Sequence, residues 1–436
     1  MKNIYTVINR FIYVIIFSTT VFITCSFQEP DVYTVTYKKL ESNSKIKEIE
    51  FVQVKGFEES YKLMFEQPID HQNPSEGSFL QKVYLSINTS RAAVVLQTDG
   101  YASGMAKKNE LTHLLDANQV IVEHRFFGDS SPKETEWRYL DTYQSSCDYH
   151  NIYKALSPIL GSDWLSTGIS KGGQTTIYYN YYFPKDMRVC VPYVAPLNLA
   201  REDKRIDKFF SRVGNREARK KVKEFRVLAL KRSKELLPYL KKEAEEKGYT
   251  FNRLEWKQAL EFIILEYEFA FWQWGNSDIK DIPTDNDSNK IIYQHLSKVS
   301  GIDFFSDQGI ERLQPFFYQA LTELGMYGYD TIGLGAHIKD IKHPDFRFTA
   351  PKGITATFDS NCNHKVYQWM KDSGNNMIFV CGENDPWNAT SFHPSKRSNS
   401  FRVVIPQGNH HSRLMNLPES KRDSIVRVMR NWLGEL

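Results

Sequence analysis

The sequence contains little cysteine and no strong excess of charge of either sign. Only five of its 436 residues are cysteine, and none of them are paired at the spacing that a zinc site needs. The formal net charge of +4 is small for a chain of this length, and no basic stripe is interleaved with stacking aromatic residues. The composition therefore gives no case for nucleic-acid binding. Internal repeats and low-complexity segments are also absent.

Long hydrophobic runs are absent too, except at the N-terminus. Lys2 and Arg10 precede an uncharged stretch over residues 11–24, which is shorter than the roughly 20 residues of a membrane span but suits the core of a signal peptide. The cysteine that follows, Cys25, resembles a bacterial lipoprotein cleavage site. We predict a signal peptide over residues 1–25, lipid attachment at Cys25, and export to the periplasm or cell envelope. Simple secretion after ordinary cleavage is the alternative.

The rest of the chain alternates between short apolar runs and segments with helical spacing. This alternation predicts an α/β fold with a mostly parallel sheet covered on both faces. The composition changes near residue 206, where the chain becomes helical and rich in Lys, Arg and Glu. We predict one sheet domain built from residues 26–205 and 346–436, with a helical cap inserted over residues 206–345. The polar start, over residues 26–50, is either a tether or an edge piece.

One short stretch, Gly168-Ile169-Ser170-Lys171-Gly172, fits the Gly-x-Ser-x-Gly pattern of a nucleophile elbow. At such an elbow a strand turns sharply into a helix, so larger side chains two residues either side of the serine would collide with neighbouring strands. A strand-like segment precedes the motif and a buried helix follows it. The alternative is a simple Gly/Ser turn between two buried elements.

Two later strand ends carry the side chains that would activate Ser170. Asp385 follows an apolar run over residues 376–381, and His410 follows another over 401–405. Ser, Asp and His occur in this order in α/β-hydrolases. Ser170 would attack a carbonyl, His410 would take its proton and pass it to the leaving amine, and Asp385 would hold the imidazole. The alternatives are that Asp385 only shapes a turn, and that His410 is a surface residue or yields its role to His411.

Backbone N–H groups near the elbow predict an oxyanion hole. Lys171 supplies one N–H because it directly follows the nucleophile, and the loop at Gly100 and Tyr101 is the natural source of the second. That loop could instead be only a turn. The charges of the segment 123–125 are interpreted as an ion pair that fixes a loop near the elbow. The paired histidines lack further ligands at metal spacing, so we predict neither a metal nor a cofactor.

Several segments together resemble the secreted prolyl tri-/tetrapeptidyl aminopeptidase family of serine peptidases, distant relatives of lysosomal prolyl carboxypeptidase and dipeptidyl peptidase II. The matching segments are Gln67-Pro68-Ile69-Asp70-His71, Asp99-Gly100-Tyr101, Glu123-His124-Arg125-Phe126-Phe127, residues 166–173, Tyr193-Val194-Ala195-Pro196, Phe271-Trp272-Gln273-Trp274 and Asp385-Pro386-Trp387. The resemblance implies an α/β-hydrolase fold with a helical cap, exopeptidase activity at free N-termini, and Ser170, Asp385 and His410 as the triad. Trp387 becomes a candidate for substrate binding.

An aminopeptidase must also neutralise the α-ammonium group of its substrate, since an unpaired charge in a closed cleft is costly. Glu268 and Glu323, on predicted cap helices beside aromatic residues, are the candidate partners, although both could be solvated helix charges. We therefore expect short peptides as substrates. An esterase on the same scaffold and a non-catalytic surface binding protein are the alternatives.

Overall fold

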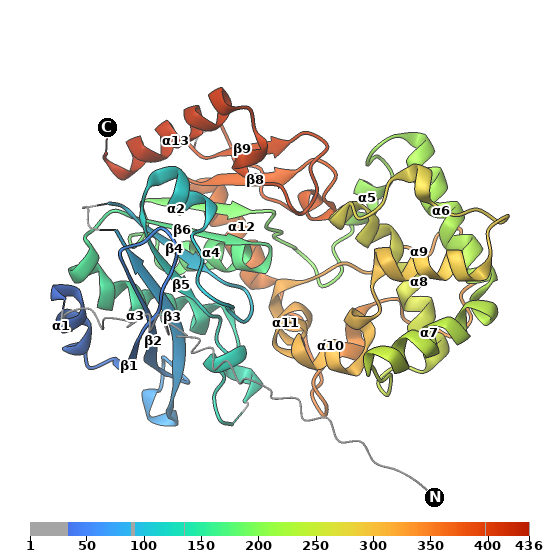
Figure 1. The fold of residues 1–436 in the computed structure, drawn as a ribbon, viewed down its shortest axis with the longest axis horizontal. Helices are drawn as coiled ribbons and strands as arrows, with labels where there is room; N and C mark the ends of the chain where they lie inside the picture. The colour runs from blue at the N-terminus through green and yellow to red at the C-terminus, as the bar shows by residue number, and fades with distance from the viewer. Residues whose placement is uncertain (1–33, 89–91, 135, 397, 436) are drawn as a thin grey trace, which may run out of the picture.

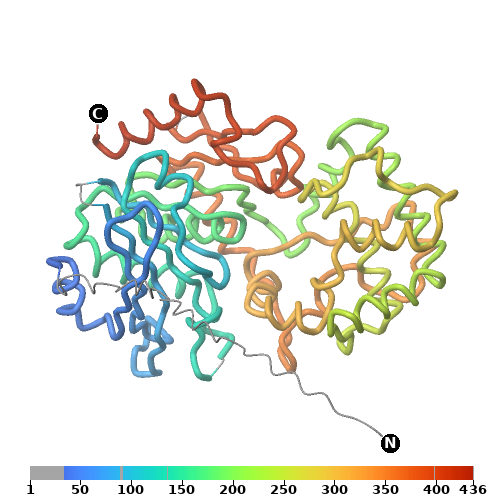
Figure 2. Tube along the Cα trace, in the orientation of Figure 1, coloured from blue at the N-terminus to red at the C-terminus, as the bar shows by residue number. Residues whose placement is uncertain are grey.

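A computed structural model of the chain describes residues 34–435, apart from residues 89–91, 135 and 397. The predicted signal peptide and Cys25 lie outside the described residues. Figure 1 shows two lobes: a sheet with helices around it, and a group of helices. The first lobe contains both the early, blue strands and the late, red segments, so chain ends far apart in sequence lie side by side there (Figure 2).

The described residues contain one nine-stranded sheet with the order β1-β2-β3-β5-β4-β6-β7-β8-β9. Its first three strands pair antiparallel, β3 also pairs antiparallel with β5, and the remaining neighbours are parallel. The strands are β1 (Ile46–Phe51), β2 (Glu59–Pro68), β3 (Ser78–Ile87), β4 (Val94–Thr98), β5 (Asn118–Val122), β6 (Trp164–Ile169), β7 (Val189–Tyr193), β8 (Ile378–Gly382) and β9 (Phe401–Ile405). This mostly parallel sheet confirms the predicted α/β-hydrolase fold.

Helices cover both faces of the sheet, as near-continuous apolar strands require. Apolar residues of α2 (Glu110–Leu115) and α13 (Glu419–Leu433) pack on one face. The other face is covered by α1 (Val35–Glu41), α3 (Thr142–Leu160), α4 (Lys171–Tyr182) and α12 (Asn361–Asp372). The residues 26–50 are an edge piece where they are described, because α1 and the edge strand β1 occupy residues 35–51.

The second lobe is formed by the chain between β7 and α12, which contains seven α-helices among the described residues (Figure 1). They are α5 (Arg205–Phe210), α6 (Arg216–Lys231), α7 (Ser233–Lys247), α8 (Trp256–Trp274), α9 (Asn289–Ser300), α10 (Asp307–Arg312) and α11 (Gln314–Gln319). They share one apolar core of their own, in which α8 is buried along most of its length. None of the described helices is both long and apolar enough to cross a membrane.

A buried ion pair joins the loop after β5 to the helix α3. Arg125, in the loop after β5, is fully buried and donates two hydrogen bonds of 2.7 Å to the carboxylate of Asp148 on α3. His71 Nε2 lies 2.7 Å from the same carboxylate. Burial alone would raise the pKa of Asp148, but Arg125 and His71 hold it below its usual value. The charges of this segment are therefore structural, as expected.

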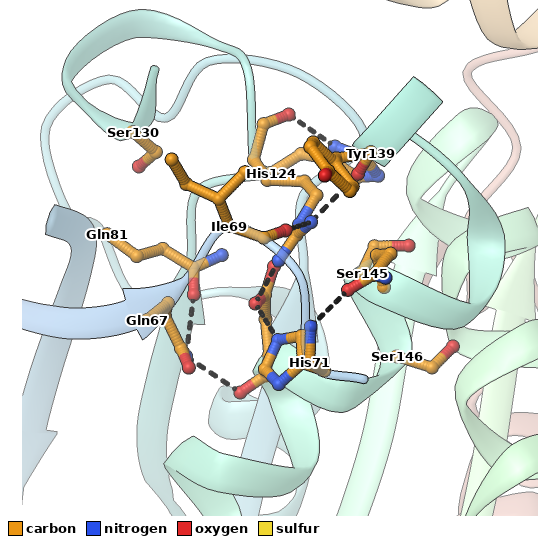
Figure 3. A network of polar contacts seen from close by, with 12 residues as sticks. Gln67, Ile69, His71, Gln81, His124, Ser130, Tyr139, Ser145 and Ser146 are labelled. Carbon is orange, nitrogen blue, oxygen red and sulfur yellow. Dashed lines mark hydrogen bonds and ion pairs between the residues drawn. The ribbon is translucent and has the colours of Figure 1, made fainter. Parts of the chain in front are cut away.

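Figure 3 shows a network of polar contacts that includes His71, Gln67 and Gln81, and in it the Gln67 amide donates a 3.0 Å hydrogen bond to the side-chain oxygen of Gln81. The Gln67 amide donates to the Asp148 carbonyl, and the Gln81 amide donates to the carbonyl of Glu123. The other hydrogen bonds of Arg125 reach the backbone carbonyls of Pro68, Ile69 and Tyr139. These hydrogen bonds connect the loops that follow β2 and β5 to α3. They also give most of the buried polar groups in this region a partner.

We predict that Asp148→Asn destabilises the protein strongly. The substitution leaves the Arg125 guanidinium buried without a counter-charge, which costs about 3–5 kcal/mol in the free energy of unfolding. Urea denaturation measures this change. The control is Glu246→Gln, which breaks the exposed pair of Lys242 and Glu246 on α7 and should change stability little. Equal stability of the two variants would contradict the prediction.

Candidate active site

Ser170 lies at a strained turn between β6 and α4. Its backbone has φ 57° and ψ −121°, a region that non-glycine residues rarely adopt. The Ser170 N–H donates to the carbonyl of Tyr193 at the end of β7, at 2.9 Å, and this bond holds the turn against the sheet. The serine therefore stands at the carboxyl end of the central strands, as the elbow motif predicts.

Close backbone contacts explain the glycines around this turn. A Cβ atom added to Gly168 would lie 2.2 Å from the carbonyl oxygen of Gly172, and one added to Gly172 would lie 2.4 Å from the carbonyl oxygen of Thr98. A Cβ atom on Gly100 would lie 2.5 Å from the backbone nitrogen of Gly172. Three segments of backbone thus meet at distances that leave no room for a side chain.

The loops after β8 and β9 bring Asp385 and His410 together. The Nδ1 atom of His410 lies 2.8 Å from Oδ2 of Asp385. Asp385 is fully buried and His410 is 5% exposed, so this hydrogen bond is shielded from water. The neighbouring His411 is exposed and has no such bond to Asp385 among the described residues. The hydrogen bond and the burial thus favour His410, and not His411, as the histidine that pairs with Asp385.

The end of the cap helix α8 fixes the position of the histidine loop. The carbonyl of Gln273 accepts a 2.9 Å hydrogen bond from the His410 N–H, and the carbonyl of Trp274 accepts one of 2.9 Å from the Asn409 side chain. The Trp274 ring meets the His410 ring edge-on, with 5.4 Å between centroids. The aromatic end of α8 therefore faces the site.

Ser170 and His410 line the same cavity, which has a volume of about 640 Å³. The predicted oxyanion residues Gly100, Tyr101 and Lys171 line it too. The N–H of Lys171 belongs to the first turn of α4, where backbone donors have no partner within the helix. The Tyr101 hydroxyl is hydrogen-bonded to the Ser170 side chain; burial raises the pKa of Tyr101, whereas this hydrogen bond lowers it.

Five of the residues that line this cavity have a buried polar atom without a hydrogen-bond partner within the described structure. These atoms are Lys171 Nζ, Gln174 Nε2, Asn198 Oδ1, Ser300 Oγ and Trp387 Nε1. Buried polar groups are normally paired, so donors and acceptors left open in one cavity indicate a polar ligand. Burial lowers the pKa of Lys171 to about 7. No group of His, Cys, Asp or Glu side chains in the described ranges is arranged to hold a metal ion.

Only one of the three predicted substrate-binding residues lies in the wall of this cavity. Trp387 lines the cavity, whereas Glu268 and Glu323 are not among the lining residues. Glu268 forms an ion pair with Arg226. Glu323 accepts 3.1 Å hydrogen bonds from the backbone N–H and the hydroxyl of Thr142, and burial raises its pKa to about 8.

Two carboxylates line the cavity: Asp99, in the loop after β4, and Glu266, which sequence reasoning missed. Glu266 lies on α8 two residues before Glu268. Helical spacing could have identified it, since residues seven apart share one face of a helix and Gln273 also lines the cavity. Glu268 follows two residues later and therefore lies on another side of the helix, where it forms an ion pair with Arg226.

Comparison with known proteins agrees with this geometry. The family model of the PS-10 peptidase S37 family matches residues 31–435. A prolyl tri/tetrapeptidyl aminopeptidase of Streptomyces mobaraensis is 35% identical over 404 residues, covering 89% of this chain and 84% of the relative. A probable serine protease of Arabidopsis thaliana, EDA2, is 23% identical over 416 residues, covering 82% of each chain.

Among solved structures, the chain is similar to a proline iminopeptidase of Mycobacterium smegmatis, with a TM-score of 0.39 and 11% identity, covering 85% of this chain and 99% of that one. An arylesterase has a TM-score of 0.37 and 11% identity, covering 92% and 90%. The fold and the sequence comparisons define a hydrolase of the serine peptidase class. The chain belongs to the S37 family of peptidases.

We predict that Gly172→Ala destabilises the elbow. The added methyl group would meet Thr98 O at 2.4 Å, and such overpacking costs about 1–3 kcal/mol. Urea denaturation measures the free energy of unfolding. Gly104→Ala is the matched control, because nothing lies within 4 Å of the added atom there. A Gly172→Ala protein as stable as this control would show that the close approach is absent.

Proposed function

We propose that the protein is an exported serine exopeptidase that releases short peptides, three or four residues long, from free N-termini, with a preference for proline before the cut. Membership of the S37 family and the named activity of the Streptomyces relative support this proposal. Short peptides are its proposed partners, and it needs no cofactor.

In the proposed mechanism, Ser170 Oγ attacks the scissile carbonyl while His410 Nε2 takes its proton. Asp385 accepts a hydrogen bond from Nδ1–H of His410, which fixes the imidazole tautomer and leaves Nε2 as the basic nitrogen. His410 then donates the proton to the leaving amine, and the acyl-enzyme is hydrolysed by water in the same way. The N–H of Lys171 and the loop at Gly100 and Tyr101 stabilise the oxyanion.

The observation that carries the proposal is the buried hydrogen bond of His410 to Asp385, at the wall of the same cavity as Ser170. Three distant loops contribute these side chains, and a histidine without a catalytic role would not need to pair with a fully buried carboxylate. A cavity of this volume suits a small ligand and excludes folded proteins.

The lining of the cavity favours a peptide as the ligand. Its lining residues carry unpaired buried donors on Lys171, Gln174 and Trp387 and an unpaired acceptor on Asn198, the kinds of group that bind the carbonyl oxygens and N–H groups of a peptide backbone. Aromatic rings of Tyr101, Trp274, Phe304, Phe316, Tyr327 and Trp387 supply apolar faces against which a proline ring can pack.

We predict that wild-type protein hydrolyses a tripeptide anilide ending in proline. Ser170→Ala should lower kcat by at least about 10⁴-fold, since the nucleophile is lost. Asp385→Asn should lower kcat by about 10⁴-fold, because an amide in place of the carboxylate favours the wrong imidazole tautomer. Release of the chromophore measures both effects. His410→Ala should lose activity, whereas His411→Ala should keep most of it; the opposite order would contradict the assignment.

Mass spectrometry of fragments from a mixed peptide library, compared between wild type and Ser170→Ala, would identify the length of the released peptide. Short acyl esters serve as the second substrate class. Hydrolysis of esters without any peptide cleavage would replace the proposed activity with that of an esterase.

We further propose export and lipid attachment at Cys25, on the basis of the charged start and apolar run that precede this residue. Wild-type protein should then partition with membranes, and Cys25→Ser should release it from them or block its processing. Cell fractionation followed by mass spectrometry of the mature N-terminus measures this. A soluble, unlipidated mature protein would instead support simple secretion.

A further inference from the structure

Glu266 is a buried carboxylate at the wall of the catalytic cavity, held in place by two tyrosines. It is 4% exposed and lies on the cap helix α8. Its two oxygens accept hydrogen bonds of 3.1 and 2.9 Å from the Tyr327 hydroxyl, and one of them accepts a 2.7 Å bond from the Tyr329 hydroxyl. Two neutral donors thus fix the direction of the carboxylate while leaving its charge uncompensated.

No ion pair to Glu266 forms among the described residues. Arg226 is a nearby cation, but it pairs with Glu268. Burial raises the pKa of Glu266 to about 8, although the two tyrosine hydrogen bonds act in the opposite direction. A carboxylate that is buried without a counter-charge is unfavourable, so a site that keeps one at its wall is suited to a cationic ligand.

The position of Glu266 suits the amino end of a short substrate. Tyr101 is hydrogen-bonded to Ser170 and lies close enough to Tyr327 to influence its pKa, and Tyr327 in turn reaches Glu266. The Trp387 ring, two residues after Asp385, meets the Tyr327 ring at 5.5 Å. Ser170 and Glu266 line the same cavity, and Tyr101 and Tyr327 line it as well. An extended tripeptide spans roughly 10 Å, so its amino group and its scissile bond can both lie within this cavity.

We propose that the carboxylate of Glu266, held by Tyr327 and Tyr329, binds the α-ammonium group of the peptide substrate and thereby restricts cleavage to free N-termini. This inference rests on the proposed peptidase function and adds the residue that selects the chain end. The incoming ammonium group supplies the missing positive charge and favours the ionised carboxylate. An N-acetylated peptide offers no charge to this carboxylate and would bind weakly.

The test compares three substrates: a tripeptide anilide with a free amino group, its N-acetylated counterpart, and a short acyl ester. Glu266→Gln should lower kcat/KM for the free peptide about 100-fold, because a buried charge pair is lost. Activity on the acetylated peptide and the ester should stay within a few-fold of wild type. The preference for a free amino group, measured as the ratio of the two peptide rates, should therefore collapse.

Glu261→Gln is the matched control. Glu261 is a buried carboxylate on the same helix, but it accepts backbone N–H groups of Lys339, Asp340 and Ile341 and does not line the cavity. The variant should keep the wild-type ratio. If Glu266→Gln yields no folded protein, Tyr329→Phe removes one donor from outside the cavity lining and should lower the free-peptide rate about fivefold, with the ester rate unchanged.

A Glu266→Gln protein with the wild-type ratio, or one that loses all three activities equally while remaining folded, would overturn the inference. Equal cleavage of free and acetylated peptides by wild type would also overturn it while leaving the serine peptidase chemistry intact. Failure of the proposed function looks different: wild type would then cleave neither peptide, or Ser170→Ala would keep its activity.

Discussion

The close approach of three backbone segments at the end of β6 is the constraint on which the site depends. Gly100, Gly168 and Gly172 bring the loop after β4 and the start of α4 into direct contact with the elbow. Only this contact allows Ser170 to be held at a positive φ and exposed to the cavity. The strain is maintained by the surrounding sheet and helices, which are fixed by apolar packing on both faces and by the ion pair of Arg125 and Asp148.

The cap helix α8 connects the helical lobe to this chemistry at two points. Its last turn accepts hydrogen bonds from the loop of His410, and Glu266, two turns earlier, lines the cavity. One rigid element thus relates the position of the imidazole to that of a carboxylate suited to a substrate amino group. A helix serves this purpose well, since residues seven apart lie on one face at a fixed separation of about 10 Å along the axis.

Much of the fold and the central part of the site could be predicted from the sequence. Glycine spacing identifies Ser170 because backbone sterics leave no other choice, and strand-end positions identify Asp385 and His410 because parallel strands end at one edge of the sheet. The composition of the cap does not show where its helices divide: α6 ends at Lys231 and α7 begins at Ser233, and the helical turn after α11 ends at Leu324.

The sequence alone could not predict which carboxylate of the cap lines the cavity. The helix α8 is apolar nearly all round, so its pattern does not identify a single face, and Glu266 and Glu268 look equivalent. Tertiary contacts distinguish them: Arg226 neutralises Glu268, whereas Tyr327 and Tyr329 leave the charge of Glu266 open. Glu323 likewise accepts a hydrogen bond from Thr142, which lies on a distant segment of the chain, and no local sequence pattern predicts this contact.

The central claim is that one serine is made reactive by a buried imidazole and carboxylate. Intact-protein mass spectrometry after treatment with a fluorophosphonate tests it most directly. The account predicts a single adduct that peptide mapping assigns to Ser170, formed much more slowly in Asp385→Asn and His410→Ala. Labelling at another residue, or equal rates of labelling in all three proteins, would contradict it.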